Sequence, residues 1–191
     1  AIFGENHPDV ATSYNNIGLV YHSQGDYVKA LEMFQRSLKI NLAIFGETHP
    51  DVATSYNNIG FVYSSQGDYV KALEMYQQSL KIRLAIFGEN HPDVATSYNN
   101  IGFVYYSQGD YVKALEMYQQ SLKIYLAIFG ENHPDVATSY NNIGVAYFAA
   151  TQKGIDMSGF QGLIEAMAFT ATTVGDGTPA AHAGMEGEYV V

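Results

Sequence analysis

The chain has 191 residues, of which 47% are hydrophobic and 15% are charged, a composition typical of a folded protein. Its formal net charge of −10 opposes contact with phosphate backbones and anionic lipid, so we expect neither nucleic acid nor a membrane as a partner. The absence of cysteine excludes disulfides, cysteine-ligated zinc and thiol catalysis.

A 42-residue unit repeats along the chain. Residues 1–42, 43–84 and 85–126 are near copies, and residues 127–144 repeat the start of the third copy letter for letter. A fixed period of this length is typical of solenoids, in which each unit is a module that buries its apolar side only against its neighbours. We therefore expect a stacked array of supersecondary units.

The first helix of the second unit is predicted to run from about residue 50 through Ser65. Pro50 suits the first helical position, where its missing N–H has no cost, and Asp51 complements the helix dipole in the first turn. Its apolar residues recur at helical spacing. The equivalent residues 42 positions before and after predict the same helix in each unit.

A second, longer helix is predicted after the turn at Gly67 and Asp68, with Asp68 as its N-cap. Apolar residues form one stripe from Tyr69 to Phe87, and Gly88 is expected to end the helix in the left-handed conformation. Gly60 in the first helix and Ala72 in the second are small residues among large ones, which predicts a close crossing of the two helices. Each unit is thus a helical hairpin.

The repeat pattern fails after Phe148, where Ala149, Ala150 and Thr151 replace the Ser-Gln-Gly of the other units. Ser158 and Gln161 form a possible capping box before apolar residues at helical spacing, which predicts a last helix at roughly 159–170 that caps the array. The glycine-rich end is predicted to be flexible. We expect two regions, the repeat array at 1–150, with three full units and the first helix of a fourth, and a divergent tail at 151–191.

The repeated residues carry a resemblance to a known family. In the second unit they are Tyr56, Ile59, Gly60, Tyr63, Gly67, Tyr69, Ala72, Tyr76 and Leu80. This pattern resembles the tetratricopeptide repeat, and the added LAIFGENHP segment with HPDVATSxNNIG is similar to the 42-residue variety of kinesin light chains. The resemblance implies an all-α fold, a right-handed α-α superhelix (solenoid) of antiparallel helix pairs. It also implies a concave groove, lined by the first helices, that receives peptides.

Positions where the copies differ are candidates for partner choice. The second and third units differ only at Thr48/Asn90, Ser64/Tyr106 and Arg83/Tyr125, and the first differs from the third at Leu19, His22, Phe34, Arg36 and Asn41. Two variable columns lie three residues apart on one face of the first helices. By resemblance, this face looks into the groove. The columns are Leu19, Phe61, Phe103 and Val145, and His22, Ser64, Tyr106 and Phe148.

Asparagines recur on the same helices. By resemblance, one column lines the groove, with Asn15, Asn57, Asn99 and Asn141, and a second lies beside it, with Asn16, Asn58, Asn100 and Asn142. An amide both donates and accepts, which suits the backbone of an extended peptide. Two interpretations stay open, namely that the asparagines grip a ligand backbone, or that they hydrogen-bond neighbouring repeats or face water.

The aromatic residues of the variable columns predict a ligand with hydrophobic or aromatic anchors. The alternative is that these rings bury one another between stacked helices. The predicted first helices contain no lysine or arginine, so acidic peptides are poor candidates, and we expect a neutral or basic protein or peptide partner.

No sequence feature predicts catalysis, a cofactor or a metal site. The histidines at 7, 49, 91 and 133 recur beside acids, but their spacing matches no zinc motif, and a role at the start of each first helix is simpler. No Ser/His/Asp order or phosphate-binding loop stands out. We therefore expect a protein that is not an enzyme.

The leading hypothesis is a protein-protein interaction module, a scaffold or adaptor that binds an extended peptide or a partner helix in its groove. The alternative is a structural or designed array that self-associates through its repeat ends and has no dedicated ligand. The opening AIFGEN is the tail of a repeat, so we expect the chain to be a fragment of a longer protein. A third hypothesis is that the array is an adaptor domain of that longer protein. Without a signal peptide or a run of ~18 apolar residues, the expected location is cytoplasmic.

Overall fold

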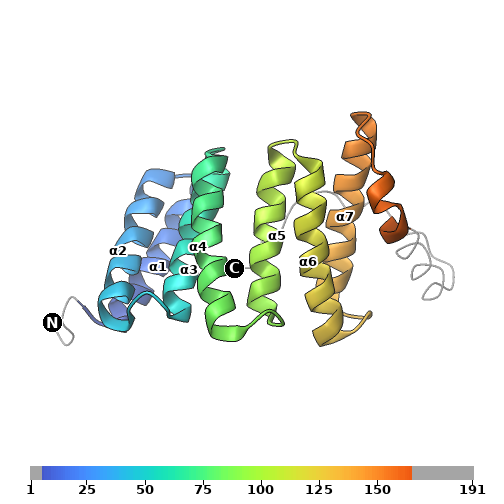
Figure 1. Cartoon of the computed structure of the whole chain (residues 1–191). Coiled ribbons are helices and arrows are strands. Elements are labelled where there is room, and N and C mark those ends of the chain that lie inside the picture. The colour runs from blue at the N-terminus through green and yellow to red at the C-terminus, as the bar shows by residue number, and fades with distance from the viewer. Residues whose placement is uncertain (1–5, 165–191) are drawn as a thin grey trace. The chain divides into compact units, whose positions relative to one another are not determined.

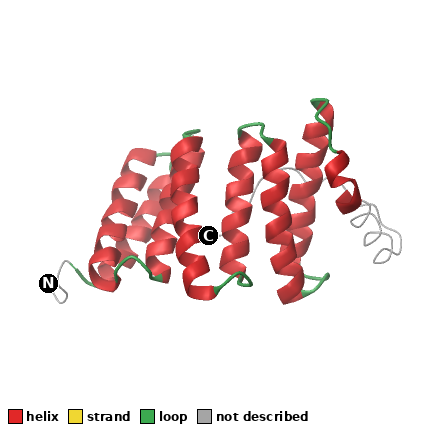
Figure 2. Ribbon diagram, viewed as in Figure 1, coloured by secondary structure: helices red, strands yellow, loops and turns green. Residues whose placement is uncertain are grey.

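A computed structural model describes residues 6–164 of the chain, while residues 1–5 and 165–191 lie outside the description. Its elements in chain order are α1 (Pro8–Ser23), α2 (Tyr27–Phe45), α3 (Pro50–Ser65), α4 (Tyr69–Phe87), α5 (Pro92–Ser107), α6 (Tyr111–Phe129), α7 (Pro134–Gln152) and the 3-10 helix η1 (Ser158–Phe160). Short loops join the helices, and the described part contains no strand (Figure 2).

The chain divides into two compact units, residues 1–155 and residues 156–191. In the first unit, α1–α2, α3–α4 and α5–α6 are antiparallel pairs that follow one another, and α7 packs on α6 (Figure 1). The expected fold class is confirmed, an all-α right-handed superhelix of antiparallel helix pairs. None of the described helices is both long and apolar enough to cross a bilayer.

The helix boundaries predicted from the second unit are confirmed by α3 and α4. Pro50 is the first residue of α3, and the Asp68 side chain caps α4 by accepting a hydrogen bond from the Lys71 N–H at 3.4 Å. Gly88 ends α4 with a φ of 75° and a ψ of −176°. The positive φ favours glycine, as expected, but the extended ψ lies outside the left-handed helical region that was predicted.

Apolar residues from successive helix pairs form the core. Ala72 and Tyr76 on α4 pack with Ile101 and Val104 on α5, and all four are almost fully buried. The equivalent cluster one repeat earlier joins Ala30 and Phe34 to Ile59 and Val62. Fully burying one such aliphatic side chain contributes about 1.5–3 kcal/mol. The core therefore lies largely between units, as expected of modules that are stable only when stacked.

The glycine in each first helix permits the close approach of its own second helix. A Cβ built on Gly102 would lie 2.8 Å from ring atoms of Tyr118, and one on Gly60 would lie 3.0 Å from the ring of Tyr76. Both distances are shorter than van der Waals contact. The predicted close crossing is thus confirmed, with an aromatic ring as the group that fills the space.

The fourth repeat departs from the others where the sequence changes. α7 has 19 residues against 16 in α5, because Ala149 and Ala150 continue the helix where the other units turn at Ser-Gln-Gly. The chain then turns at Gly154, whose φ is 69°.

The second unit is described only through residue 164. Ser158 was expected to be an N-cap, but it lies inside η1, and its N–H donates to Oδ1 of Asp156 at 2.9 Å. Residues 161–164 are helical. The rest of the expected helix at 159–170 and the whole glycine-rich end lie outside the described residues, so the terminal cap stays a proposal.

Candidate interaction surface

The two asparagine columns are joined to each other across successive repeats. Asn58 donates from Nδ2 to Oδ1 of Asn15 at 2.6 Å. Asn100 donates in the same way to Asn57 at 2.9 Å, and Asn142 to Asn99 at 2.8 Å. These bonds fix the orientation of the Asn15, Asn57 and Asn99 amides. Each bond uses the carbonyl oxygen of that amide, and the amino group of Asn57 donates to no other described residue.

The first variable column is half-buried between neighbouring units. Leu19 packs against the cluster formed by Ala30, Phe34, Ile59 and Val62, and Phe61 packs against the equivalent cluster one repeat later. Phe103 and Val145 are also half-buried. Part of each side chain thus stabilises the array, and part stays accessible.

The second variable column changes in exposure along the chain. In the first repeat, the His22 ring lies 4.1 Å from the Phe61 ring, centroid to centroid, and its Nε2 is 2.9 Å from Oγ of Ser65 on the next first helix. Partial burial lowers the pKa of His22. Ser64 and Tyr106 are half-buried, whereas Phe148 is 65% exposed. The column therefore offers its most accessible aromatic group on α7.

The recurring histidines cap the first helices. Nδ1 of His49 accepts a hydrogen bond from the Asp51 N–H at 3.2 Å, and the His49 ring stacks on Phe45 with a centroid distance of 3.9 Å. The same arrangement recurs at His91 and His133, whose rings stack on Phe87 and Phe129. No group of three or more potential metal ligands converges within the described ranges. The histidines thus have a structural place at the helix starts.

Lysines at the start of the second helices are paired locally. Nζ of Lys71 lies 2.6 Å from Oδ2 of Asp68 and 5.2 Å from the centre of the Tyr63 ring. Lys29 and Lys113 repeat this arrangement with the preceding aspartates and tyrosines of their own units. This local pairing neutralises three of the chain's few cations.

Asn41, Arg83 and Tyr125 form a third variable column, which is buried between the helices. The sequence pattern did not predict a role for this column. Nη1 of Arg83 donates to the Asp93 carbonyl at 3.0 Å and to Oγ of Ser97 at 2.9 Å. Asn41 makes the equivalent bonds one repeat earlier, to Ser55 at 3.2 Å and to the Asp51 carbonyl at 3.4 Å. Polar residues on a helix stripe that is otherwise apolar were the sequence signal that could have identified this column.

Ionisation is disfavoured in this column. Burial lowers the pKa of Arg83, and the negative charge of the Asp93 carboxylate opposes this shift. Burial also raises the pKa of Tyr125, whose hydroxyl lies 3.0 Å from Oγ1 of Thr96 within its own repeat. Three nearly identical repeats thus place three different polar groups at one position.

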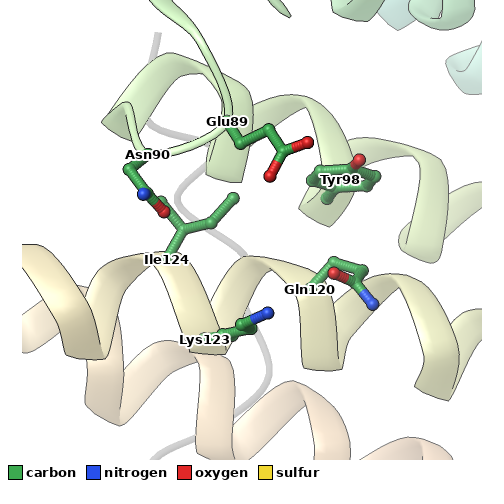
Figure 3. Close-up of a pocket in the computed structure, with 6 residues that line it drawn as sticks. All are labelled: Glu89, Asn90, Tyr98, Gln120, Lys123 and Ile124. Carbon is green, nitrogen blue, oxygen red and sulfur yellow. The ribbon is translucent and has the colours of Figure 1, made fainter.

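A small cavity of about 150 Å³ opens between α5 and α6 (Figure 3). We call it the α5–α6 notch, and its lining residues are Glu89, Asn90, Tyr98, Gln120, Lys123 and Ile124. Figure 3 shows Glu89 and Tyr98 on one wall and Gln120 and Lys123 on the wall formed by α6. Its lining is thus mainly polar and includes both an acid and a base.

The stacked helix pairs and the polar and aromatic rows on their first helices define a class, the helical-repeat arrays. A family model described as tetratricopeptide repeat matches residues 1–43, 51–127 and 93–153. The chain belongs to the tetratricopeptide repeat family. The family generally mediates protein-protein interactions and is generally non-catalytic.

Solved structures share this fold. The crystal structure of BtubC (BKLC) from P. vanneervenii is similar with a TM-score of 0.72 and 25% identity, over 96% of this chain and 73% of that chain. Two crystal structures of a Podosopora anserina putative kinesin light chain with nearly identical TPR-like repeats have TM-scores of 0.69. Their identities are 23% and 22%, over 88% and 90% of this chain and 78% and 80% of those chains. No curated protein sequence matches the chain.

Proposed function

We propose that the array is a non-catalytic interaction module that holds an extended peptide or a partner helix in the concave groove of its first helices. The observation that carries this proposal is the row of oriented asparagine amides. The next repeat holds the carbonyl oxygen of Asn15, Asn57 and Asn99 at 2.6–2.9 Å. Each fixed amide keeps N–H groups for a ligand carbonyl, and groups fixed in advance lose less entropy when they bind.

The proposed partner is neutral or basic and carries apolar or aromatic anchors. The half-buried Phe61, Phe103 and Tyr106 and the exposed Phe148 supply apolar surface beside the amides. The net charge of −10 and the absence of lysine and arginine from α1, α3, α5 and α7 favour a basic ligand over an acidic one. The groove residues of the proposal are those of the two variable columns and the Asn15, Asn57, Asn99 and Asn141 column.

A test of this proposal uses the two ends of one hydrogen bond. Asn57→Ala and Asn100→Ala both break the bond between these residues, but only Asn57→Ala removes the groove-side amide. We expect Asn57→Ala to weaken binding of a partner, isolated by a peptide-library screen against the whole chain, by roughly tenfold relative to Asn100→Ala. Titration calorimetry measures the affinities, and circular dichroism checks that helicity is unchanged.

Equal losses in the two variants would mean that the asparagines act only by joining repeats, which contradicts the gripping role. Unchanged binding in both variants would also contradict it.

A second candidate function is end-to-end self-association, and the outer face of α1 favours it. Val20 is 55% exposed and Ile17 is 43% exposed, whereas their equivalents Val62 and Ile59 on α3 are buried against α2. Exposed apolar side chains at equivalent positions are suited to packing against another helix. Under this hypothesis the arrays stack on one another and the groove has no dedicated ligand.

A further inference from the structure

The first repeat holds a guanidinium beside Tyr14, the equivalent of the notch residue Tyr98. Cζ of Arg36 lies 5.5 Å from the centre of the Tyr14 ring, and its Nη1 donates to the Tyr14 hydroxyl at 3.4 Å. Its Nη2 donates to Oε1 of Glu32, one helical turn earlier, at 2.6 Å. One arginine thus contacts both a tyrosine ring and a glutamate.

The second and third repeats keep this tyrosine and this glutamate but lack the arginine. Gln78 and Gln120 stand at the equivalent of Arg36, while Tyr56 and Tyr98 are the equivalent tyrosines. Glu74 and Glu116 are the equivalent glutamates, and neither forms an ion pair with a described residue. In the third repeat Tyr98 and Gln120 line the α5–α6 notch, whose lining does not include Glu116 (Figure 3).

We propose that the second and third repeats bind arginine side chains of a partner protein at these tyrosines and glutamates. One guanidinium would lie at Tyr56 and Glu74, and one at Tyr98 and Glu116, each arranged as Arg36 is in the first repeat. The net charge of −10 favours such a ligand, and Glu89 adds a carboxylate to the lining of the third-repeat notch. This site uses none of the residues assigned to the groove, so it does not depend on the proposed groove function.

Lys123 does not prevent this occupancy. Its equivalent Lys39 lies one turn after Arg36 on α2, where the guanidinium is nevertheless held over Tyr14. A planar guanidinium stacks on an aromatic ring and donates to two acceptors at once, whereas an ammonium is a compact, strongly hydrated charge. The notch is therefore expected to prefer arginine over lysine at equal charge.

The repeat geometry sets the spacing of the two arginines in a partner. Equivalent places in successive units are about 8–10 Å apart, one helix spacing, because the first helices of successive units contact each other directly, as Asn58 contacts Asn15 and Phe61 contacts His22. An extended chain advances about 3.3 Å per residue, so arginines about three residues apart would reach both sites. Each contact is exposed and weak alone, and two linked contacts would add avidity.

The test is a titration of the whole isotope-labelled chain with a designed peptide, followed by amide chemical shifts in α5 and α6. The peptide is capped at both ends and carries two arginines about three residues apart in a glycine-serine-glutamine spacer, the spacing set by the distance between the two sites. A matched peptide carries lysines instead. We expect the arginine peptide to bind about fivefold or more tightly than the lysine peptide, with the largest shifts around Tyr98 and Gln120.

A pair of variants locates the site. Gln78→Arg with Gln120→Arg installs beside Tyr56 and Tyr98 the guanidinium that the first repeat already has, so we expect the preference for the arginine peptide to be lost. Gln77→Arg with Gln119→Arg adds the same charge at neighbouring positions, and we expect the preference to persist. Equal affinities for the two peptides, equal losses in the two double variants, or no shifts at the notch at millimolar peptide would each overturn the proposal.

Discussion

At the scale of single residues, the buried column of Asn41, Arg83 and Tyr125 distinguishes parts of the array that are otherwise almost identical. Arg83 carries a charge into a site where its described partners are a carbonyl and a hydroxyl. Removing a charge from water costs several kcal/mol unless a close opposite charge offsets it. The contact between α4 and α5 therefore bears a desolvation cost that the contact between α2 and α3, with neutral Asn41, does not.

We predict that Arg83→Met stabilises the chain by about 1 kcal/mol, because the substitution removes the buried charge while it keeps the apolar stem. No acceptor is orphaned, since Oγ of Ser97 still donates to the Asp93 carbonyl at 3.0 Å. Thermal unfolding followed by circular dichroism measures the change, and a midpoint about 2–4 °C higher is expected. Arg36→Met, at an exposed position, is the control and should change the midpoint little. A lower midpoint for Arg83→Met would mean that the two hydrogen bonds outweigh the desolvation cost.

At the scale of elements, the helical hairpin depends on the contact between a glycine and an aromatic ring. Gly18, Gly60 and Gly102 contact Phe34, Tyr76 and Tyr118 in the first three repeats. A Cβ on Gly144, the equivalent on α7, would have no described atom within 4 Å. One sequence position therefore lies in two different environments, which makes it a test of helix packing within one chain.

We predict opposite effects for alanine at two of these positions. Gly102→Ala forces the Tyr118 ring away from α5, and such overpacking costs about 1–3 kcal/mol. Gly144→Ala meets no described neighbour and gains helix propensity, worth up to about 1 kcal/mol. Urea unfolding of both variants measures the difference. Equal destabilisation would contradict an open face on α7.

At the scale of the whole molecule, the repeat array buries at its internal contacts the same residues that it exposes at α1. Ile59 and Val62 on α3 are 3% and 0% exposed, against 43% and 55% for Ile17 and Val20 on α1. The difference arises from position alone, because the residue types are the same. This apolar face is the observation on which the self-association hypothesis depends.

If arrays join through α1, the sedimentation coefficient of the chain will rise with concentration. Val20→Asp should then abolish the rise, because it places a charge in the new contact. Val70→Asp is the matched control, since Val70 is 66% exposed on α4, away from α1, and should leave assembly unchanged. A chain that sediments as a monomer at every concentration would contradict self-association.

Much of the fold was predictable from the sequence because the determinants of each hairpin are local. Pro50, Asp68 and Gly88 mark the helix ends of the second unit, and the boundaries of α3 and α4 match them. Gly60 indicated a close crossing before the position of Tyr76 was known. The error at Ser158 is also local, since a capping box describes a regular helix start and η1 begins differently.

What the sequence determined by itself is the period, the class of fold and the helix limits, since propensities, caps and turn residues act within a few residues of the chain. Only the tertiary structure decided what each repeated side chain contacts. Asn57 bonds to Asn100, Arg83 is buried against α5, and Arg36 lies over Tyr14, all through contacts between residues at least 10 positions apart. The repeated sequence places identical residues at equivalent positions, but their neighbours depend on which helices stack on either side.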